Sequence, residues 1–303
     1  MIDKLEMLLA LASERHFGRA AEVVGVTQQS FSAGIKQLED RLGVLLVHRG
    51  SRFQGFTAEG EKALEWARRI VGDARAMRQE VRRLSRGLAG HLRIAAIPTA
   101  LPVVASLTTP FHARHPGVRF TIRSTTSAEI LSLLANLEAD IGLTYLDNEP
   151  LGRVTALPLY RESYRLITAA EAPLGRRNAV TWAEAAEVPL CLLTPDMQNR
   201  RIIDAHLRAA GTAPATALES NSMIVLMTHV RTGRWASILP TVLAELLGLT
   251  GHLRAIPITA PEVSHAIGLV ALQRDPALPL VSAFVAEARE AALGFSGGEE
   301  VPV

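Results

Sequence analysis

Residues 17–42 read FGRAAEVVGVTQQSFSAGIKQLEDRL, and this stretch predicts two helices joined by a tight turn. The first helix, at about residues 18–24, has a face of small apolar side chains, and Gly25 permits a sharp turn after it. The second helix is expected over 28–42, with Thr27 as N-cap and Gly43 as stop. Its predicted apolar face consists of Phe31, Ile35, Leu38 and Leu42. Two helices in this arrangement are typical of the helix-turn-helix motif.

The start of the second helix carries side chains that can hydrogen-bond to base edges or to phosphates. They are Gln28, Gln29, Ser30 and Ser32, with Lys36 one turn further on. A helix N-terminus also attracts phosphate. The alternative is a polar, solvated helix face, because Gln and Ser are common surface residues.

Residues 46–57, LVHRGSRFQGFT, predict two short extended segments around a Gly-Ser turn, which together form a β-wing. Arg49 and Arg52 are expected at its tip, well placed for phosphate or the minor groove. A hairpin with two solvated arginines is the alternative.

A long helix is expected after Thr57, which is suited to cap it, with Glu59 and Glu61 near its positive end. Apolar residues recur along it at alternating spacings of four and three, which is a heptad seam. The seam residues are Ala63, Ala67, Ile70, Ala74, Met77, Val81 and Leu84. Such a seam needs a partner helix, and homodimerisation is the economical interpretation; packing against the chain's own second domain is the alternative. Residues 85–90 predict a flexible joint.

The composition bounds the remaining possibilities. A chain of 303 residues with 48% hydrophobic side chains predicts about two folded domains. Residues 1–90 hold 15 Lys and Arg against 11 Asp and Glu, a net charge of +4, whereas the rest sums to −2. This modest concentration of basic residues suits a DNA-binding head. Neither a signal peptide nor a membrane span is indicated, and a single cysteine fits a reducing cytoplasm.

From residue 91 on, the pattern changes to strands alternating with helices. Extended segments at 91–97, 118–122 and 140–144 are separated by helical ones, which predicts a mostly parallel sheet with helices on its faces. Ligands bind such sheets outside the carboxyl ends of the strands, where loops lead into helices. Hydroxyl and amide side chains occur in four such loops, at Thr99-Ala100, Thr125-Thr126-Ser127, Thr194–Gln198 and Ser220–Ser222.

Hydroxyl groups and free N–H groups at helix N-termini make a good anion site, so these loops predict a site for a small anion or carboxylate. Ordinary N-capping is the alternative for any one of them.

The N-terminal motifs resemble those of the LysR-type transcriptional regulators. The matching positions are 17–21, 26–32, Ile35, Leu38, Glu39, Leu42, Gly43, Leu45, Arg49 and 56–60. Gln29 departs from the family pattern, which usually has Pro or a small residue there, and can alter base preference. Val47-His48 departs as well, and so does Arg234-Trp235 in the looser Val230–Pro240 element. Trp235 is compatible with a place in the core, in the cleft or at an interface.

The resemblance implies an α/β protein with an all-α winged helix-turn-helix domain at 1–57 and a linker/dimerisation helix and hinge at 58–90. An effector-binding domain at 91–303 would then be similar to periplasmic binding proteins. Its first subdomain would span 91–162 with 267–293, and its second 163–266. Arg19 and Thr27 join the expected DNA contacts, and the expected effector contacts are Thr99, Ala100, Thr125, Thr126, Ser127, Thr194 and Asn221.

The same resemblance implies a cytoplasmic transcriptional regulator whose promoter binding or activation responds to a small-molecule effector. Its expected partners are double-stranded promoter DNA, the effector and further copies of itself, as a dimer and a dimer of dimers. RNA polymerase is a candidate partner, and no cofactor is expected. A solute-binding protein or enzyme that carries a DNA-binding-like head is the competing interpretation.

Catalytic signatures are missing from the sequence. It has no Walker loop, dinucleotide fingerprint, HExxH motif or nucleophile elbow, so we expect no enzyme activity. His112 and His115 form an HxxH pattern with no clear further ligands, which favours a solvated helix end over a metal site. Cys191 lies in an apolar strand and is expected to be buried and inert.

Overall fold

Three helices form the N-terminal head of the chain in the computed structural model, which describes residues 1–48, 50, 53–147, 149–212, 216–246 and 252–295. They are α1 (Ile2–Glu14), α2 (Phe17–Val23) and α3 (Gln28–Leu42). Thr27 Oγ1 accepts a hydrogen bond from the Ser30 amide at 3.2 Å, and Gly43 ends α3 with a φ of 72°, as the sequence predicts. Phe31, Ile35 and Leu38 are buried, but Leu42 is 48% exposed. It is the last residue of α3 and lies beyond the packed face.

Part of the predicted wing lies among the described residues. One antiparallel bridge joins Val47 to Phe56, flanked by a hydrogen bond from the His48 amide to the Gly55 carbonyl at 3.1 Å. Arg49 and Arg52, the expected tip residues, lie outside the described residues.

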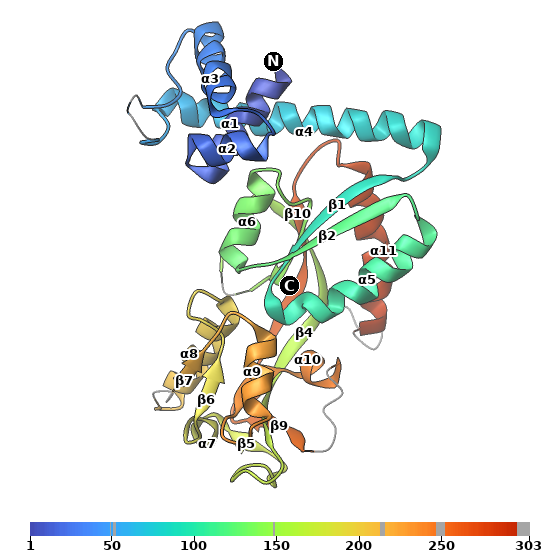
Figure 1. The fold of residues 1–303 in the computed structure, drawn as a ribbon. Helices are drawn as coiled ribbons and strands as arrows, with labels where there is room; N and C mark the ends of the chain where they lie inside the picture. Colours follow the sequence, from blue (N-terminus) through green and yellow to red (C-terminus); the bar gives the residue numbers. More distant parts are fainter. Residues whose placement is uncertain (49, 51–52, 148, 213–215, 247–251, 296–303) are drawn as a thin grey trace.

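The long helix α4 (Ala58–Arg86) leaves the head and runs across the top of the molecule in Figure 1. Thr57 Oγ1 caps it by accepting a hydrogen bond from the Gly60 amide at 2.9 Å, as predicted. Its first half belongs to the head, because Leu64, Ala67 and Val71 are buried with the leucines of α1.

Below α4 lies a first lobe, which we define as residues 90–163 together with 264–295. Strands β1 (Gly90–Ala96), β2 (Val118–Ser124) and β3 (Ile141–Tyr145) run parallel, connected by η1 (Pro98–Ala100), α5 (Leu101–Arg114) and α6 (Ser127–Ala135). Helix α11 (Pro279–Phe295) completes this lobe.

A second lobe, residues 164–263, lies at the other end of the molecule (Figure 1). Its strands are β5 (Val180–Thr181), β6 (Leu190–Leu192), β7 (Thr216–Glu219), β8 (Ser237–Pro240) and β9 (Leu253–Thr259). Its helices are α7 (Trp182–Ala186), α8 (Gln198–Ala209), α9 (Met223–Val230) and α10 (Thr241–Leu246).

Two long strands, β4 (Val154–Ala169) and β10 (Ser264–Leu272), join the lobes. Strand β4 pairs with β10 as far as Ser163, and from Tyr164 on it pairs with β8 and β9. The main sheet has the order β2-β1-β3-β10-β4-β9-β5, with β8 also on β4, and β6 and β7 form a separate pair. The sheet is therefore mixed rather than mostly parallel, because β10 and β4 run antiparallel to their neighbours.

Candidate DNA-binding surface and ligand cleft

The outer face of α3 is polar and exposed. Gln28, Gln29, Ser30, Ser32 and Lys36 are all exposed, whereas the opposite face is buried against α1 and α2. The first three turns of α3 thus present amide, hydroxyl and ammonium groups, next to the free N–H groups of the helix N-terminus. That combination suits contacts with base edges and phosphates.

Two of the predicted DNA contacts are already engaged within the head. Thr27 Oγ1 caps α3 and also donates to Ser30 Oγ at 3.0 Å. Arg19 is held against α1, with its Nε 3.1 Å from a Glu14 carboxylate oxygen and its Nη2 2.6 Å from the Glu14 carbonyl. Both residues position the motif, and the Arg19 side chain remains 60% exposed.

The exposed apolar residues of α4 differ in part from the predicted seam. Ile70, Met77, Val81 and Leu84 are 41–79% exposed, but Ala67 is fully buried within the head and Ala63 and Ala74 are half-buried. Trp66, which the heptad spacing does not include, is 54% exposed, with the Arg69 guanidinium 5.2 Å from its ring centre. The solvent-facing stripe therefore runs Trp66-Ile70-Met77-Val81-Leu84, because the alanine positions of the first half face α1.

Buried hydroxyl groups gather at the carboxyl ends of strands, where the sequence predicts the ligand. In the described part of the chain, the hydroxyl oxygens of Thr99, Ser127, Thr144 and Thr194 are buried and have no hydrogen-bond partner. Thr144 lies near the carboxyl end of β3, and Thr99 and Ser127 follow the carboxyl ends of β1 and β2. Because these strands are parallel, the three residues lie at the same end of the sheet. Thr144 was not predicted, although a hydroxyl within a strand that is otherwise apolar was the available signal.

The other predicted ligand contacts have different surroundings. Thr126 Oγ1 caps α6 by accepting from the Glu129 amide at 3.1 Å, and the Thr125 hydroxyl donates to the Glu129 carboxylate. The Ala100 amide is already bonded to the Ile97 carbonyl at 3.0 Å, and Asn221 is exposed in the loop before α9. Bonds to Glu129 thus account for the hydroxyl groups of Thr125 and Thr126, whereas the hydroxyl group of the adjacent Ser127 has no partner.

A buried polar network lies where β4 passes between the lobes, and sequence reasoning missed it. The Tyr145 hydroxyl donates to the fully buried Glu162 carboxyl group, and Asn199 Nδ2 of the second lobe donates to Tyr145 at 3.0 Å. Burial raises the pKa of Glu162 to about 8 and raises the pKa of Tyr145 as well. Glu162 is therefore mostly protonated at neutral pH.

Helix α8 fastens the second lobe to the first through further contacts. His206 Nε2 lies 3.4 Å from His265 Nε2, and Arg201 pairs with Glu149 at 2.6 Å. Burial is the main cause that lowers the pKa values of both histidines. Because α8 begins directly after the Thr194 loop, this helix connects that loop with the contact between the lobes.

The remaining reactive residues have structural partners. His112 Nδ1 lies 3.0 Å from the Val118 carbonyl, and His115 Nε2 lies 3.0 Å from Glu287. Cys191 is buried, as predicted, and burial raises the pKa of its thiol to about 11. Trp235 is half-buried against the core of the second lobe.

Among the described residues, no cluster of three or more His, Cys, Asp or Glu could hold a metal ion. None of the helices in the described ranges is long and apolar enough to cross a membrane.

Two family models match separate parts of the chain. Residues 2–61 match "Bacterial regulatory helix-turn-helix protein, lysR family", and residues 85–293 match "LysR substrate binding domain". A similar protein from Dickeya chrysanthemi, "Hydrogen peroxide-inducible genes activator", is 27% identical over 270 residues, covering 89% of this chain and 88% of that protein.

Solved structures resemble the whole chain. A full-length OxyR variant from Pseudomonas aeruginosa has a TM-score of 0.72 at 24% identity, covering 97% of this chain and 94% of that one. Full-length CbnR in complex with its target DNA has a TM-score of 0.61 at 21% identity, covering 96% and 99%. Both structures share the fold of this chain along nearly its whole length, from the N-terminal head to the second lobe.

Proposed function

Because this chain belongs to the LysR family of bacterial helix-turn-helix regulators, we propose that it controls transcription at a promoter in response to a small molecule. We divide it into a DNA-binding domain (1–57), a linker helix with its hinge (58–90) and an effector-binding domain (91–303). Within the last, residues 91–162 and 267–293 form one subdomain and 163–266 the other. We place its action in the cytoplasm, where the chromosome is.

The observation that carries the DNA-binding part is the polar outer face of α3. Gln28 and Ser32 are exposed one turn apart and leave the buried face of the helix intact. Side chains of this kind hydrogen-bond to base edges in the major groove. A DNase footprint of the purified full-length protein on the DNA upstream of its own gene tests this function. Protection that is absent there and at neighbouring promoters would contradict it.

Pairing of two heads is supported by the exposed stripe on α4. Trp66, Ile70, Met77, Val81 and Leu84 form a contiguous apolar face on a solvent-facing helix, and such faces mark interaction sites. A second copy of the same helix is the partner that the stripe fits, since it offers the same spacing. We propose a dimer, and a dimer of dimers for the assembly on DNA.

The effector that the buried hydroxyl groups suit is a small anion or a carboxylate. Thr99, Ser127 and Thr194 offer buried hydroxyl groups without partners, and Ser127 begins α6, whose N-terminus favours negative charge. Nearby arginines are already paired, Arg123 with Glu129 and Arg201 with Glu149. Recognition would therefore rely on neutral hydroxyl and backbone donors.

Peroxide sensing through a thiol is not supported for this chain, although several relatives are named as peroxide-inducible activators. Cys191 is the single cysteine, it is buried in β6, and its raised pKa keeps it as the unreactive thiol. A resolving cysteine is absent from the sequence. We propose that the effector binds non-covalently and that no thiol is oxidised. We also propose that the protein has no enzyme activity.

A further inference from the structure

Helix α6 ends in a motif that normally contains glycine but here contains leucine. The Leu137 amide bonds to the Leu134 carbonyl at 3.0 Å, and the Glu138 amide bonds to the Leu133 carbonyl at 2.8 Å. This pair of hydrogen bonds ends a helix when the residue after the C-cap adopts the left-handed conformation. Here that residue is Leu137, which has a φ of 60°. A side chain is strained in that conformation, so an external interaction must compensate for it.

The compensating interaction is made with the DNA-binding head. The Leu137 side chain is 6% exposed and belongs to the apolar cluster of the head, together with Leu8 and Leu9 of α1. Leu272 at the end of β10 packs against the same cluster. The first lobe thus places one strained leucine into the core of another domain.

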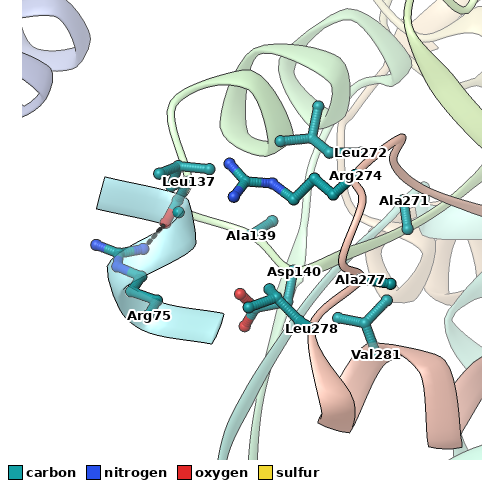
Figure 2. A pocket seen from close by; sticks show the side chains of 11 residues that line it. Arg75, Leu137, Ala139, Asp140, Ala271, Leu272, Arg274, Ala277, Leu278 and Val281 are labelled. Atoms are coloured by element: carbon teal, nitrogen blue, oxygen red, sulfur yellow. Dashed lines mark hydrogen bonds between the residues drawn. The ribbon is translucent and has the colours of Figure 1, made fainter. Parts of the chain in front are cut away.

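Polar contacts to α4 surround this leucine, as Figure 2 shows for part of the contact. Arg75 Nη1 donates to the Leu137 carbonyl at 2.7 Å, and Arg68 Nη2 donates to Asn136 Oδ1 at 3.1 Å. In the reverse direction, Arg274 Nη2 of the first lobe donates to the Arg68 carbonyl at 3.0 Å.

Gly72 makes room for this contact in the middle of α4. A Cβ atom there would lie 1.5 Å from Arg274 Nη1, so the guanidinium packs directly on the bare backbone. Glycine weakens a helix interior, and the close approach of Arg274 gives a reason for its presence. We call these contacts of Arg68, Gly72, Arg75, Leu137 and Arg274 the latch.

Helix α6 connects the latch with the candidate ligand site, the buried hydroxyl groups of Thr99, Ser127, Thr144 and Thr194. It begins at Ser127, Leu137 lies two residues after its last residue, and its nine residues span about 14 Å. We propose that α6 is a rigid connector through which order at its N-terminal end controls the docking of the DNA-binding head on the first lobe. The nature of the input rests on the proposed effector site, whereas the latch does not depend on it.

Hydrogen–deuterium exchange of the full-length protein tests the latch without any ligand. Leu137→Gly removes the leucine side chain but suits the left-handed backbone, so α6 stays intact. We expect amides of residues 68–76 to exchange faster, on the order of tenfold, while residues 127–135 keep their protection. Unchanged exchange at 68–76 would overturn the latch.

Gly72→Ala gives a second test when it is compared with and without Arg274. Alanine strengthens an isolated helix by about 1 kcal/mol, so without a latch the exchange of residues 68–76 should slow about fivefold. With the latch, the new methyl group displaces the Arg274 guanidinium, so Gly72→Ala should slow exchange less in the wild-type background than in an Arg274→Ala background. Equal slowing in both backgrounds would contradict the docking of Arg274.

The connector is tested from its far end. Thr126→Ala removes the N-cap of α6, and Thr181→Ala removes the equivalent cap of α7 in the second lobe as a matched control. We expect Thr126→Ala, and not Thr181→Ala, to raise exchange at residues 68–76. No rise in Thr126→Ala, or an equal rise in both variants, would overturn the connector. A failed search for an effector would leave both results standing.

Discussion

The Tyr145 hydroxyl donates a hydrogen bond to the buried carboxyl group of Glu162 at the point where β4 leaves the first lobe. Asn199 of α8 completes the contact from the second lobe, so the pair links the two halves of the effector-binding domain. A protonated carboxyl group suits this place, because burial disfavours its charged form. The contact between the lobes is therefore coupled to pH.

Glu162→Gln should remove a pH dependence of stability. The pKa of Glu162 is raised from 4.5 to about 8 in the folded state, so the folded protein keeps a proton that the unfolded chain loses. Its stabilising contribution is full below about pH 4.5 and falls by at most about 1.4 kcal/mol per pH unit until about pH 8. Thermal unfolding between pH 5 and 9 measures it, and the variant should show a shallower decline.

The exposed Glu171 provides the control for that experiment. Glu171→Gln removes an acid that is 82% exposed and should leave the slope of the wild type unchanged. His206 and His265 titrate in all three proteins and cancel in the comparison. Equal slopes for wild type and Glu162→Gln would contradict the protonated carboxyl group.

Gln28→Ala and Ser32→Ala should each weaken specific DNA binding far more than non-specific binding. Loss of a base contact costs about 1–3 kcal/mol, roughly 5- to 150-fold in affinity, and does not affect contacts with phosphates. Gel-shift titrations with a footprinted site and with scrambled DNA measure both affinities. Arg176→Ala is the control, because Arg176 is 83% exposed in the second lobe, outside the DNA-binding head. Equal losses on both DNAs would reject base readout.

Charges placed in the stripe on α4 should separate the protomers. Met77→Asp combined with Leu84→Asp would bury two carboxylates in a helix–helix contact, which should weaken the dimer at least about a hundredfold. Sedimentation velocity at micromolar concentration should then show a monomer. The neighbouring exposed Arg78→Ala should sediment as the wild type does. A double variant that still dimerises would place the interface elsewhere.

Thr99→Val should reduce the response of the protein to anions. Valine keeps the shape of the buried threonine but removes its unpartnered hydroxyl group, so one ligand hydrogen bond of about 1 kcal/mol is lost. A thermal-shift screen of inorganic anions, small carboxylates, neutral compounds and amines provides the measurement. Thr228→Val, at an exposed position of α9, is the control. Stabilisation by neutral or cationic compounds alone would count against an anion site.

Cys191→Ser should leave promoter binding unchanged in the presence and absence of hydrogen peroxide. The thiol is buried, and its raised pKa keeps it protonated, so the native wild type should react slowly with a thiol reagent. After denaturation, the same reagent should count one thiol per chain. Loss of binding in peroxide that depends on Cys191 would revive thiol-based sensing.

Local chemistry made much of the fold predictable from the sequence. The helices of the head, their caps at Thr27 and Thr57 and the alternating order after residue 90 follow from residues that lie close together in the chain. The predicted seam and the exposed apolar stripe differ in part, because the first half of α4 has two apolar faces. Spacing alone could not say that Ala67 faces α1 while Trp66 faces solvent.

The sequence by itself determined the family, the head and the loops in which a ligand site could form, because caps and periodicities are properties of neighbouring residues. Only the tertiary structure decided which hydroxyl groups in those loops remain unpartnered. Thr126 and Ser127 are adjacent, yet the Thr126 hydroxyl caps α6 and the Ser127 hydroxyl has no partner. The tertiary structure also brought Glu162 to Asn199 and Leu137 to the head. Burial of these side chains depends on segments far apart in the chain, and no local pattern encodes that packing.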